Sequence, residues 1–369
     1  MRVLILANID MGLYKFRREL LEELVKKNEV FFCVPDGEFV GSIKEIGCRF
    51  VPCAVMERHG TNPIKELKLI SFYKKTLKDI KPDIVFTYTI KCNAYGGMVC
   101  ASLGIPYVAN VTGLGTAVEN GGMLQKIALM MYRRGLRKAQ KVFFQNAENQ
   151  DFMLKHKVVK GDYDLLPGSG VNLSQYEVYP YPDGETVDFI FVARVKKEKG
   201  IDQYLDAAKE IRGKHPETRF HICGFCEQDY EEKLKRLNEE GVIIYHGLVS
   251  DMKPMYQMAA CTVHPSYSEG LSNVLLESSA CGRPIITTDR SGCREVVEDG
   301  VNGYMIPQKD SRALINAIEN FLKLNYCKKK QLGLNGRKIV EDNFDRQIII
   351  EAYMKEIHSV AMTLEGYLT

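Results

Sequence analysis

Short apolar runs alternate along this chain with longer segments of helical periodicity, and the alternation occurs in two blocks. The short runs are rich in Val, Ile and Phe and predict buried strands, whereas apolar positions at helical spacing predict amphipathic helices. Strands that alternate with helices imply a parallel sheet covered on both faces. The first block predicts strands at 3–8, 29–34, 83–87, 106–111 and 141–145, and helices at 13–27, 63–80 and 123–138.

The second block repeats this pattern and predicts a second α/β domain. Pro and Gly cluster within 166–184, where both periodicities stop, which is typical of a linker. We therefore expect a first domain at 1–166, a linker at 167–186 and a second domain at 187–345. One or two amphipathic helices at about 346–369 should pack back on the first domain. The second block predicts strands at 187–193, 219–223, 242–246, 261–265, 284–287 and 303–306, and helices at 201–214, 230–239, 271–281 and 311–324.

The composition is that of ordinary globular domains. The 369 residues are too many for one typical α/β core, and 45% hydrophobic with 26% charged residues is usual for a soluble chain. No apolar run reaches the roughly 20 residues needed to cross a bilayer. The 11 cysteines are odd in number and scattered, as expected of free thiols in a reducing compartment. We therefore expect a cytoplasmic protein.

The net charge of +3 is unevenly distributed. Residues 1–170 carry 25 Lys and Arg against 17 Asp and Glu, whereas residues 171–369 carry 25 against 30. A basic N-terminal half favours an anionic partner, either a membrane surface or an acceptor that carries phosphate, and we expect no nucleic-acid partner. The basic amphipathic segment 123–141 fits two interpretations, a helix on an anionic bilayer or an ordinary helix with a solvated basic face.

The segment Pro265–Pro284 is the most informative part of the second domain. A helix should begin after Gly270, and the first turn of a helix leaves backbone N–H groups unpaired at the positive end of its dipole. A diphosphate placed there would satisfy these donors, and Gly270 would let it approach the backbone closely. The expected donors belong to Leu271, Ser272 and Asn273.

Two carboxylates bracket this turn. Glu269 lies in the loop before the helix, and Glu277 follows a little over two helical turns later. A carboxylate accepts two hydroxyl hydrogen bonds well, which suits a ribose diol. With the flanking Gly282-Arg283-Pro284, they resemble the E-x7-E motif of retaining glycosyltransferases of the GT-B fold, family 4. The resemblance implies that Glu269 lies by the donor sugar and that Glu277 binds the ribose; the alternative is two solvated surface carboxylates.

A second match to this family lies in Phe191–Gly200, after the first strand of the second block. The family places an Arg and a Lys five residues apart on this loop, and Arg194 and Lys199 have that spacing. The resemblance assigns them to a clamp on the donor diphosphate. The leaving nucleoside diphosphate gains negative charge in the transition state, and fixed cations stabilise that charge. Because this clamp can replace the charge of a metal, we expect neither a metal ion nor a cofactor.

The N-terminal half should hold the acceptor, because open α/β sheets bind ligands where their parallel strands end, here at the loops expected at 87–93 and 110–116. Gly12 follows the first strand, where the family keeps glycine near the donor phosphate; many members have two adjacent glycines, and this chain has one. Many members also have a His where Tyr88–Lys91 falls, and this chain has none there. Lys91, Asn93 and Gly113-Leu114-Gly115 resemble the branch that acts on undecaprenyl-diphosphate-linked glycans, such as the N-acetylgalactosaminyltransferase of bacterial N-glycan assembly. The acceptor-side candidates are Lys91, Asn93, Gly113 and Glu119.

The resemblance implies two Rossmann-like domains whose parallel sheets face each other across a cleft. It also implies transfer of a hexose or N-acetylhexosamine from a nucleotide sugar, with UDP favoured over GDP, to a lipid-linked glycan or polysaccharide precursor. Anomeric configuration would be retained. The reaction would belong to bacterial surface glycan synthesis, with the enzyme peripheral on the cytoplasmic face of the inner membrane.

Two alternatives stay open at this point. A UDP-sugar 2-epimerase of the same fold would need acid–base carboxylates and a His facing the sugar, and His residues are scarce in the N-terminal half. A catalytically silent, membrane-associated scaffold would keep the fold without turnover. The intact set of Arg194, Lys199, Glu269 and Glu277 argues against both.

Overall fold

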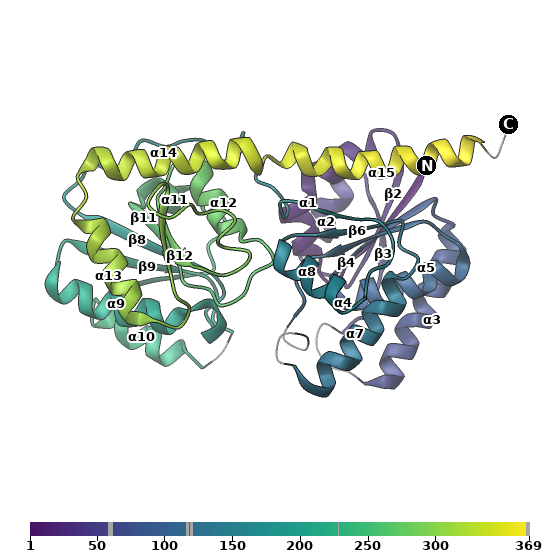
Figure 1. Cartoon of the computed structure of the whole chain (residues 1–369), viewed down its shortest axis with the longest axis horizontal. Helices are drawn as coiled ribbons and strands as arrows, with labels where there is room; N and C mark the ends of the chain where they lie inside the picture. Colours follow the sequence, from purple (N-terminus) through teal and green to yellow (C-terminus); the bar gives the residue numbers. More distant parts are fainter. Residues whose placement is uncertain (58–61, 116–117, 119–120, 228, 367–369) are drawn as a thin grey trace. The chain divides into compact units, whose positions relative to one another are not determined.

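Two compact units make up the computed structural model of this chain (Figure 1). Unit 1 comprises Met1–Ser169 and Gln347–Thr369, and unit 2 comprises Gly170–Arg346. The chain therefore leaves unit 1 once and returns to it with its last helix. The structure describes all residues except 58–61, 116–117, 119–120, 228 and 367–369.

Seven parallel strands form the sheet of unit 1, in the order β3-β2-β1-β4-β5-β6-β7. Strands β1 and β4 are neighbours in the sheet, so the chain reverses the direction in which it adds strands between them. The strands are β1 (Arg2–Leu6), β2 (Glu29–Val34), β3 (Arg49–Pro52), β4 (Ile84–Tyr88), β5 (Tyr107–Val111), β6 (Lys141–Phe144) and β7 (Tyr163–Leu165). The helical segments are α1 (Asp10–Val25), α2 (Val40–Glu45), α3 (Pro63–Ile80), α4 (Thr89–Lys91), the π-helical turn η1 (Cys92–Gly96), α5 (Gly97–Leu103), α7 (Gly122–Leu136), α8 (Ala147–Lys155) and, after unit 2, α15 (Arg346–Gly366).

The alternating side chains of β1 show that this sheet is buried on both faces. Val3 and Ile5 belong to one core cluster with residues of α1 and α15, whereas Leu4 and Leu6 belong to another with residues of α3 and α7. Successive side chains of a strand point to opposite faces, so each set meets a different layer of helices (Figure 1).

Helix α15 completes one of these cores from the far end of the chain. Tyr353 is fully buried, and its ring lies 5.1 Å from that of Phe86. Its hydroxyl donates to Oδ1 of Asn110 and accepts from the Tyr88 hydroxyl at 2.9 Å. The Arg17 guanidinium lies over the rings of Tyr88 and Tyr353, at 5.4 and 6.0 Å from their centres. Helix α15 is thus hydrogen-bonded to residues at the ends of β4 and β5.

Six parallel strands form the sheet of unit 2, in the order β10-β9-β8-β11-β12-β13, and the direction of addition reverses between β8 and β11. Helices α9, α10 and α13 pack on one face, and α11, α12 and α14 on the other (Figure 1). The strands are β8 (Val187–Val192), β9 (Thr218–Cys223), β10 (Ile244–Gly247), β11 (Cys261–His264), β12 (Ile285–Thr288) and β13 (Gly303–Ile306). The helices are the 3-10 turn η2 (Lys197–Lys199), α9 (Ile201–Lys214), α10 (Glu231–Glu239), α11 (Lys253–Met258), α12 (Asn273–Ala280), α13 (Ser311–Leu322) and α14 (Tyr326–Asn343).

The predicted α/β class with two parallel sheets is confirmed. Every predicted strand is present within two residues of its expected bounds. Strands β3 and β7 were not predicted, because both are short sheet edges without an apolar alternation. Helix α14 was not predicted either, and α12 begins at Asn273, with Ser272 as its N-cap, later than the expected start after Gly270.

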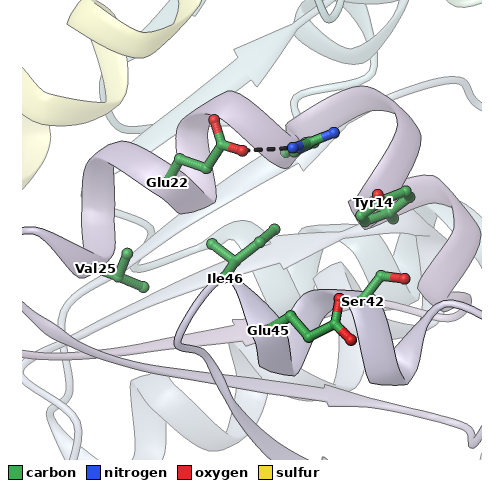
Figure 2. Close-up of a pocket in the computed structure, with 7 residues that line it drawn as sticks. Tyr14, Glu22, Val25, Ser42, Glu45 and Ile46 are labelled. Carbon is green, nitrogen blue, oxygen red and sulfur yellow. Dashed lines mark hydrogen bonds and ion pairs between the residues drawn. The ribbon is translucent and has the colours of Figure 1, made fainter.

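A pocket of about 270 Å³ lies between α1 and α2 (Figure 2). The Arg18 guanidinium on its wall donates to Glu22 at 2.8 Å, so this cation is already paired. None of the residues predicted to carry chemistry lines this pocket. Within the described residues, no helix combines the length and the apolar character that crossing a bilayer requires.

Gly200 provides a test of how the loops after β8 and β11 fit together. It has a φ of 75°, and an added Cβ would lie 2.0 Å from the carbonyl oxygen of Pro265. We expect Gly200→Ala to lower the free energy of unfolding by more than about 1 kcal/mol, measured by denaturant unfolding. Gly213→Ala is the matched control, because a Cβ at this position in α9 meets open space. It should raise stability by up to about 1 kcal/mol, and equal losses in both variants would contradict the close approach.

Candidate active site

The carboxyl ends of β8 and β11 carry the charged residues that the sequence singled out. Open α/β sheets bind ligands at the carboxyl ends of their strands, where the strand order reverses, and unit 2 reverses between β8 and β11. The loop after β8 carries Arg194 and Lys199, and the loop after β11 carries Glu269 and leads into α12. The fold therefore brings Lys199 and Glu269 together across 70 positions of sequence.

The Glu269 carboxylate joins the charged side chains at this edge of the sheet. Its Oε1 accepts from Nζ of Lys199 at 2.5 Å and from Nε2 of His264 at 2.9 Å, and all three side chains are largely buried. Burial alone would raise the pKa of Glu269, but the Lys199 charge and the His264 hydrogen bond outweigh it and hold that pKa well below its usual range. Because an ionised carboxylate can only accept, Nε2 of His264 carries the proton.

The loop around Gly292 supports the backbone on both sides of Glu269. A Cβ added to Gly292 would lie 2.6 Å from the Glu269 carbonyl oxygen, so the two backbones are in close contact. The Gly292 carbonyl accepts from the Ser272 N–H at 2.8 Å, and its own N–H donates to Oε2 of Glu295 at 2.7 Å. Glu295 thus fixes the loop on which Glu269 and the start of α12 rest.

The expected diphosphate donors at the start of α12 are not equivalent. The Ser272 N–H is bonded to Gly292, and the Ser272 side chain makes no capping bond to the helix. Leu271 and Ser272 are buried, whereas Gly270 and Asn273 are partly exposed. The first N–H groups of α12, starting at Asn273, have no intrahelical acceptor by the geometry of an α-helix. Of the three expected donors, the Ser272 N–H is therefore already paired, whereas the Asn273 N–H has no intrahelical acceptor.

Glu277 lies on α12, partly buried, and is oriented by a neighbouring tyrosine. The Tyr256 hydroxyl donates to Oε2 of Glu277 at 2.9 Å. Burial raises the pKa of Tyr256, and the charge of Glu277 raises it further, so this hydroxyl stays protonated and keeps donating. The Glu277 carboxylate is held in one orientation, as a hydrogen-bond acceptor for a diol requires.

Arg194 is engaged by a carboxylate that the sequence did not indicate. Its Nη1 donates to both oxygens of Glu227, at 2.7 and 2.8 Å, and Nζ of Lys196 lies 3.7 Å from the same group. The bonds recorded for Arg194 within the described residues involve only Nη1, and a guanidinium has five N–H donors. Glu227 therefore orients the Arg194 side chain, and the Nε and Nη2 donors of Arg194 stay available for an anion.

In unit 1, Gly12 and Lys91 flank the reversal point between β1 and β4. Gly12 lies in the first turn of α1, after the buried Asp10, whose Oδ2 accepts from the Phe39 N–H at 2.7 Å. Lys91 ends α4, and its Nζ lies 2.6 Å from Oε1 of Glu66. The segment after β4 was expected to be a loop, but it runs directly into α4, η1 and α5.

The other acceptor-side candidates lie in different surroundings. Asn93 is fully buried, accepts from Oγ1 of Thr87 at 2.7 Å and donates to the Asn110 carbonyl at 2.8 Å. Its amide therefore joins the ends of β4 and β5 inside the core. Gly113 is partly exposed after β5. Glu119 lies outside the described residues.

Four residues that complete these clusters, namely His264, Glu227, Glu66 and Tyr256, were missed by reasoning from sequence. His264 ends β11, so its place at the carboxyl end of a predicted strand was the available signal. Glu227 and Glu66 lie 33 and 25 positions from the cations they bind, on segments that carry no motif. Only the tertiary fold shows those two pairings.

Both halves of the chain match glycosyltransferase family models. Residues 2–146 match the model described as glycosyl transferase 4-like, and residues 181–339 match glycosyl transferases group 1. With two parallel α/β sheets and this charged strand edge, the chain is a glycosyltransferase of the GT-B fold. The group 1 model covers most of unit 2 and the 4-like model most of unit 1, and both models describe glycosyltransferases.

Similar proteins act in bacterial glycan synthesis. The chain is 25% identical to the N,N'-diacetylbacillosaminyl-diphospho-undecaprenol alpha-1,3-N-acetylgalactosaminyltransferase of Campylobacter jejuni, over 96% of this chain and 98% of that protein. It is also 31% identical to the capsular polysaccharide biosynthesis glycosyltransferase CapM of Staphylococcus aureus, over 48% of this chain and 47% of that protein. Among solved structures it resembles Anabaena HepE in complex with UDP and glucose, with a TM-score of 0.78, 19% identity, and 97% and 99% of the two chains covered.

The lowered pKa of Glu269 predicts how the free energy of unfolding depends on pH. A carboxyl whose pKa falls on folding stabilises the native state above its unfolded pKa, near 4.5, and loses that contribution as the pH falls toward its folded pKa. We expect Glu269→Gln to reduce the free energy of unfolding by about 3 kcal/mol at pH 7, because Lys199 is left buried without its counter-ion. The difference between the two proteins should be constant above about pH 5 and shrink below about pH 4.5. Denaturant unfolding across pH measures it, and a pH-independent difference would contradict the ionised state of Glu269.

Proposed function

We propose that this glycosyltransferase moves a hexose or N-acetylhexosamine from a UDP-sugar to a lipid-linked glycan or polysaccharide precursor, with retention of anomeric configuration. The observation that carries the proposal is the buried, ionised Glu269 held by Lys199 and His264 beside the start of α12. An ionised carboxylate next to a fixed cation suits a site that accepts sugar hydroxyls and faces a diphosphate. Glu269 would hold hydroxyls of the donor sugar and would not act as a nucleophile.

The chain can meet the charge of the leaving diphosphate with its own groups. Arg194 and Lys199 supply two cations, and the first turn of α12 supplies N–H donors at the positive end of a helix dipole. Charge that develops on the leaving group is then stabilised without a metal ion or another cofactor. Glu277, oriented by Tyr256, would accept from the ribose hydroxyls. The acceptor hydroxyl would attack from the face that the diphosphate leaves, and a donor phosphate oxygen would take its proton.

A lipid-linked acceptor is supported by unit 1 and by the relatives. The name of the Campylobacter jejuni relative describes transfer to a diphospho-undecaprenol-linked sugar, and its match covers 96% of this chain. Residues 1–170 carry the excess of Lys and Arg, which suits an acceptor with phosphate. The epimerase alternative is not favoured, since the similar proteins with printed activities are transferases.

The starts of α3 and α7 support a peripheral position on the cytoplasmic face of an anionic membrane. On α7, Met123 and Leu124 are 78% and 60% exposed. Ile64 and Leu67 of α3 are each 66% exposed. Large apolar side chains this exposed favour burial in a bilayer interface, and neighbouring Lys and Arg favour its anionic lipids. The basic residues of these two helices are Lys65, Lys68, Lys74, Lys75, Lys78, Lys126, Arg133 and Arg134.

A donor panel with one clamp variant tests the reaction. Among UDP- and GDP-sugars, we expect a UDP-sugar to be turned over only when a lipid-linked acceptor is present, measured as UDP release. Arg194→Ala should lower turnover by about 100-fold, because a fixed cation at the leaving group is lost. Its stability should change by less than about 1 kcal/mol, since the Arg194–Glu227 pair is about one-third exposed.

Lys196→Ala is the matched control, because Lys196 faces the same Glu227 carboxylate but lies outside the proposed clamp. Turnover within about threefold of the parent is expected for it. Sugar conversion without an acceptor would support the epimerase, whereas donor binding with no turnover would support the scaffold. Near-normal turnover in Arg194→Ala would contradict the clamp.

The exposed apolar residues of α7 make the membrane proposal testable. We expect the combined variant Met123→Ser, Leu124→Ser and Ile127→Ser to bind vesicles containing anionic lipid at least about tenfold more weakly, measured by co-sedimentation. Leu248→Ser is the control, because Leu248 is 71% exposed but lies in unit 2. It should bind as the parent does. Unchanged sedimentation of the α7 variant would overturn the membrane contact.

A further inference from the structure

The ammonium of Lys91 is incompletely satisfied where strand order reverses in unit 1. Its Nζ lies 2.6 Å from Oε1 of Glu66, and the two side chains are only 18% and 12% exposed. An ammonium has three N–H donors, and Glu66 is the one acceptor recorded for Lys91 in the part of the chain that the structure describes. A buried cation with donors to spare is ready to bind an anion.

The partner carboxylate is incompletely satisfied as well. Oε2 of Glu66 is buried and has no hydrogen-bond partner among the described residues. Burial raises the pKa of the nearby Tyr95, and the charge of Glu66 raises it further. A largely buried ion pair whose carboxylate has an oxygen without a partner contributes little stability for its desolvation cost. Structural support alone does not explain why it is buried.

The backbone that carries Lys91 is strained. Thr89 has a φ of 70°, a left-handed conformation that β-branched residues rarely adopt. The next turn, Cys92–Gly96, is π-helical, a rare geometry that is frequent at functional sites. Residues held in such conformations cluster at ligand sites, where the surrounding structure maintains them. Strain and a π-turn flank Lys91 immediately on both sides.

The surroundings of the pair suit a ligand with an anionic head and an apolar tail. Helix α3 precedes β4 and runs back along the parallel sheet, so its first turn, with Glu66, reaches the edge where β4 ends. On the same turn, Ile64 and Leu67 are each 66% exposed. The counter-ion of Lys91 and an exposed apolar surface therefore lie next to each other on α3.

We propose that Lys91 binds the diphosphate of a lipid-linked acceptor, and that Glu66 is the counter-ion that this diphosphate displaces. The proposal rests on the function proposed above and adds the group that the acceptor site recognises. With no acceptor present, Glu66 holds Lys91 in place. When the acceptor binds, its phosphate oxygens take the place of the Glu66 carboxylate on the ammonium, and the exposed apolar residues of α3 lie beside the lipid.

Binding of geranyl diphosphate, a short prenyl diphosphate, tests this with the full chain and saturating UDP to fill the donor site. By isothermal titration calorimetry, Lys91→Gln should bind it at least about tenfold more weakly, because a charge-assisted hydrogen bond is lost. Glu66→Gln should bind it several-fold more tightly, because the competing carboxylate is gone. If Glu66 competes with the diphosphate for Lys91, the two variants change affinity in opposite directions. If the ion pair only supports the fold, both variants should bind geranyl diphosphate more weakly. Lys91→Arg keeps the cation and should stay within about threefold, which covers the case in which Lys91→Gln does not fold.

Lys26→Gln is the matched control, because Lys26 pairs with Glu23 at the end of α1, is largely exposed and belongs to neither proposed binding surface. It should bind geranyl diphosphate as the parent does. Weaker binding in both Lys91→Gln and Glu66→Gln, or none in the parent, would overturn the proposal. Inorganic pyrophosphate bound as tightly as geranyl diphosphate would overturn the lipid part. Thermal stabilisation by UDP alone, measured in parallel, reports the donor site, so its failure would count against the proposed function and not against Lys91.

Discussion

The ion pair between Lys199 and Glu269 is the constraint on which the site in unit 2 depends. One partner follows β8 and the other follows β11, so the pair forms only when these strands are neighbours in the sheet. A buried carboxylate is costly unless cations or N–H groups surround it, and this one has both Lys199 and His264. The loops must therefore approach closely, and glycine at Gly200 and Gly292 makes that approach possible.

Much of this site could be predicted from sequence because it is local. Glu269 and Glu277 lie in one segment at motif spacing, and Arg194 and Lys199 share one loop, so periodicity and resemblance sufficed to find them. The hydrogen-bond and ion-pair partners of these residues could not be predicted from sequence. Glu227 binds Arg194 because of how separate loops meet, and the Ser272 N–H is taken by a glycine twenty positions away. Pairings of this kind are decided by tertiary packing, which hydrophobic patterns do not encode.

Unit 1 has the same architecture, but its sequence predicts the residues at the ligand edge less well. The strand order identifies the edge between β1 and β4 as the place for a ligand, and Lys91 lies there. The strand–helix pattern predicts that edge, but it also predicts a loop after β4. The structure has strained helical turns there, and these have no sequence signal. Asn93 shows that a polar residue at a strand end can also serve the core, because its buried amide bridges two strands.

Helix α15 has a consequence for how the protein is made. Tyr353 completes the core of unit 1, and its hydrogen-bond partner Asn110 lies 243 positions earlier in the chain. Unit 2 is a single contiguous stretch, Gly170–Arg346, and can finish folding as soon as it leaves the ribosome. Unit 1 is synthesised first but receives the last piece of its core only after all of unit 2 has been synthesised. The order in which the two units mature is thus the reverse of the order in which they are synthesised.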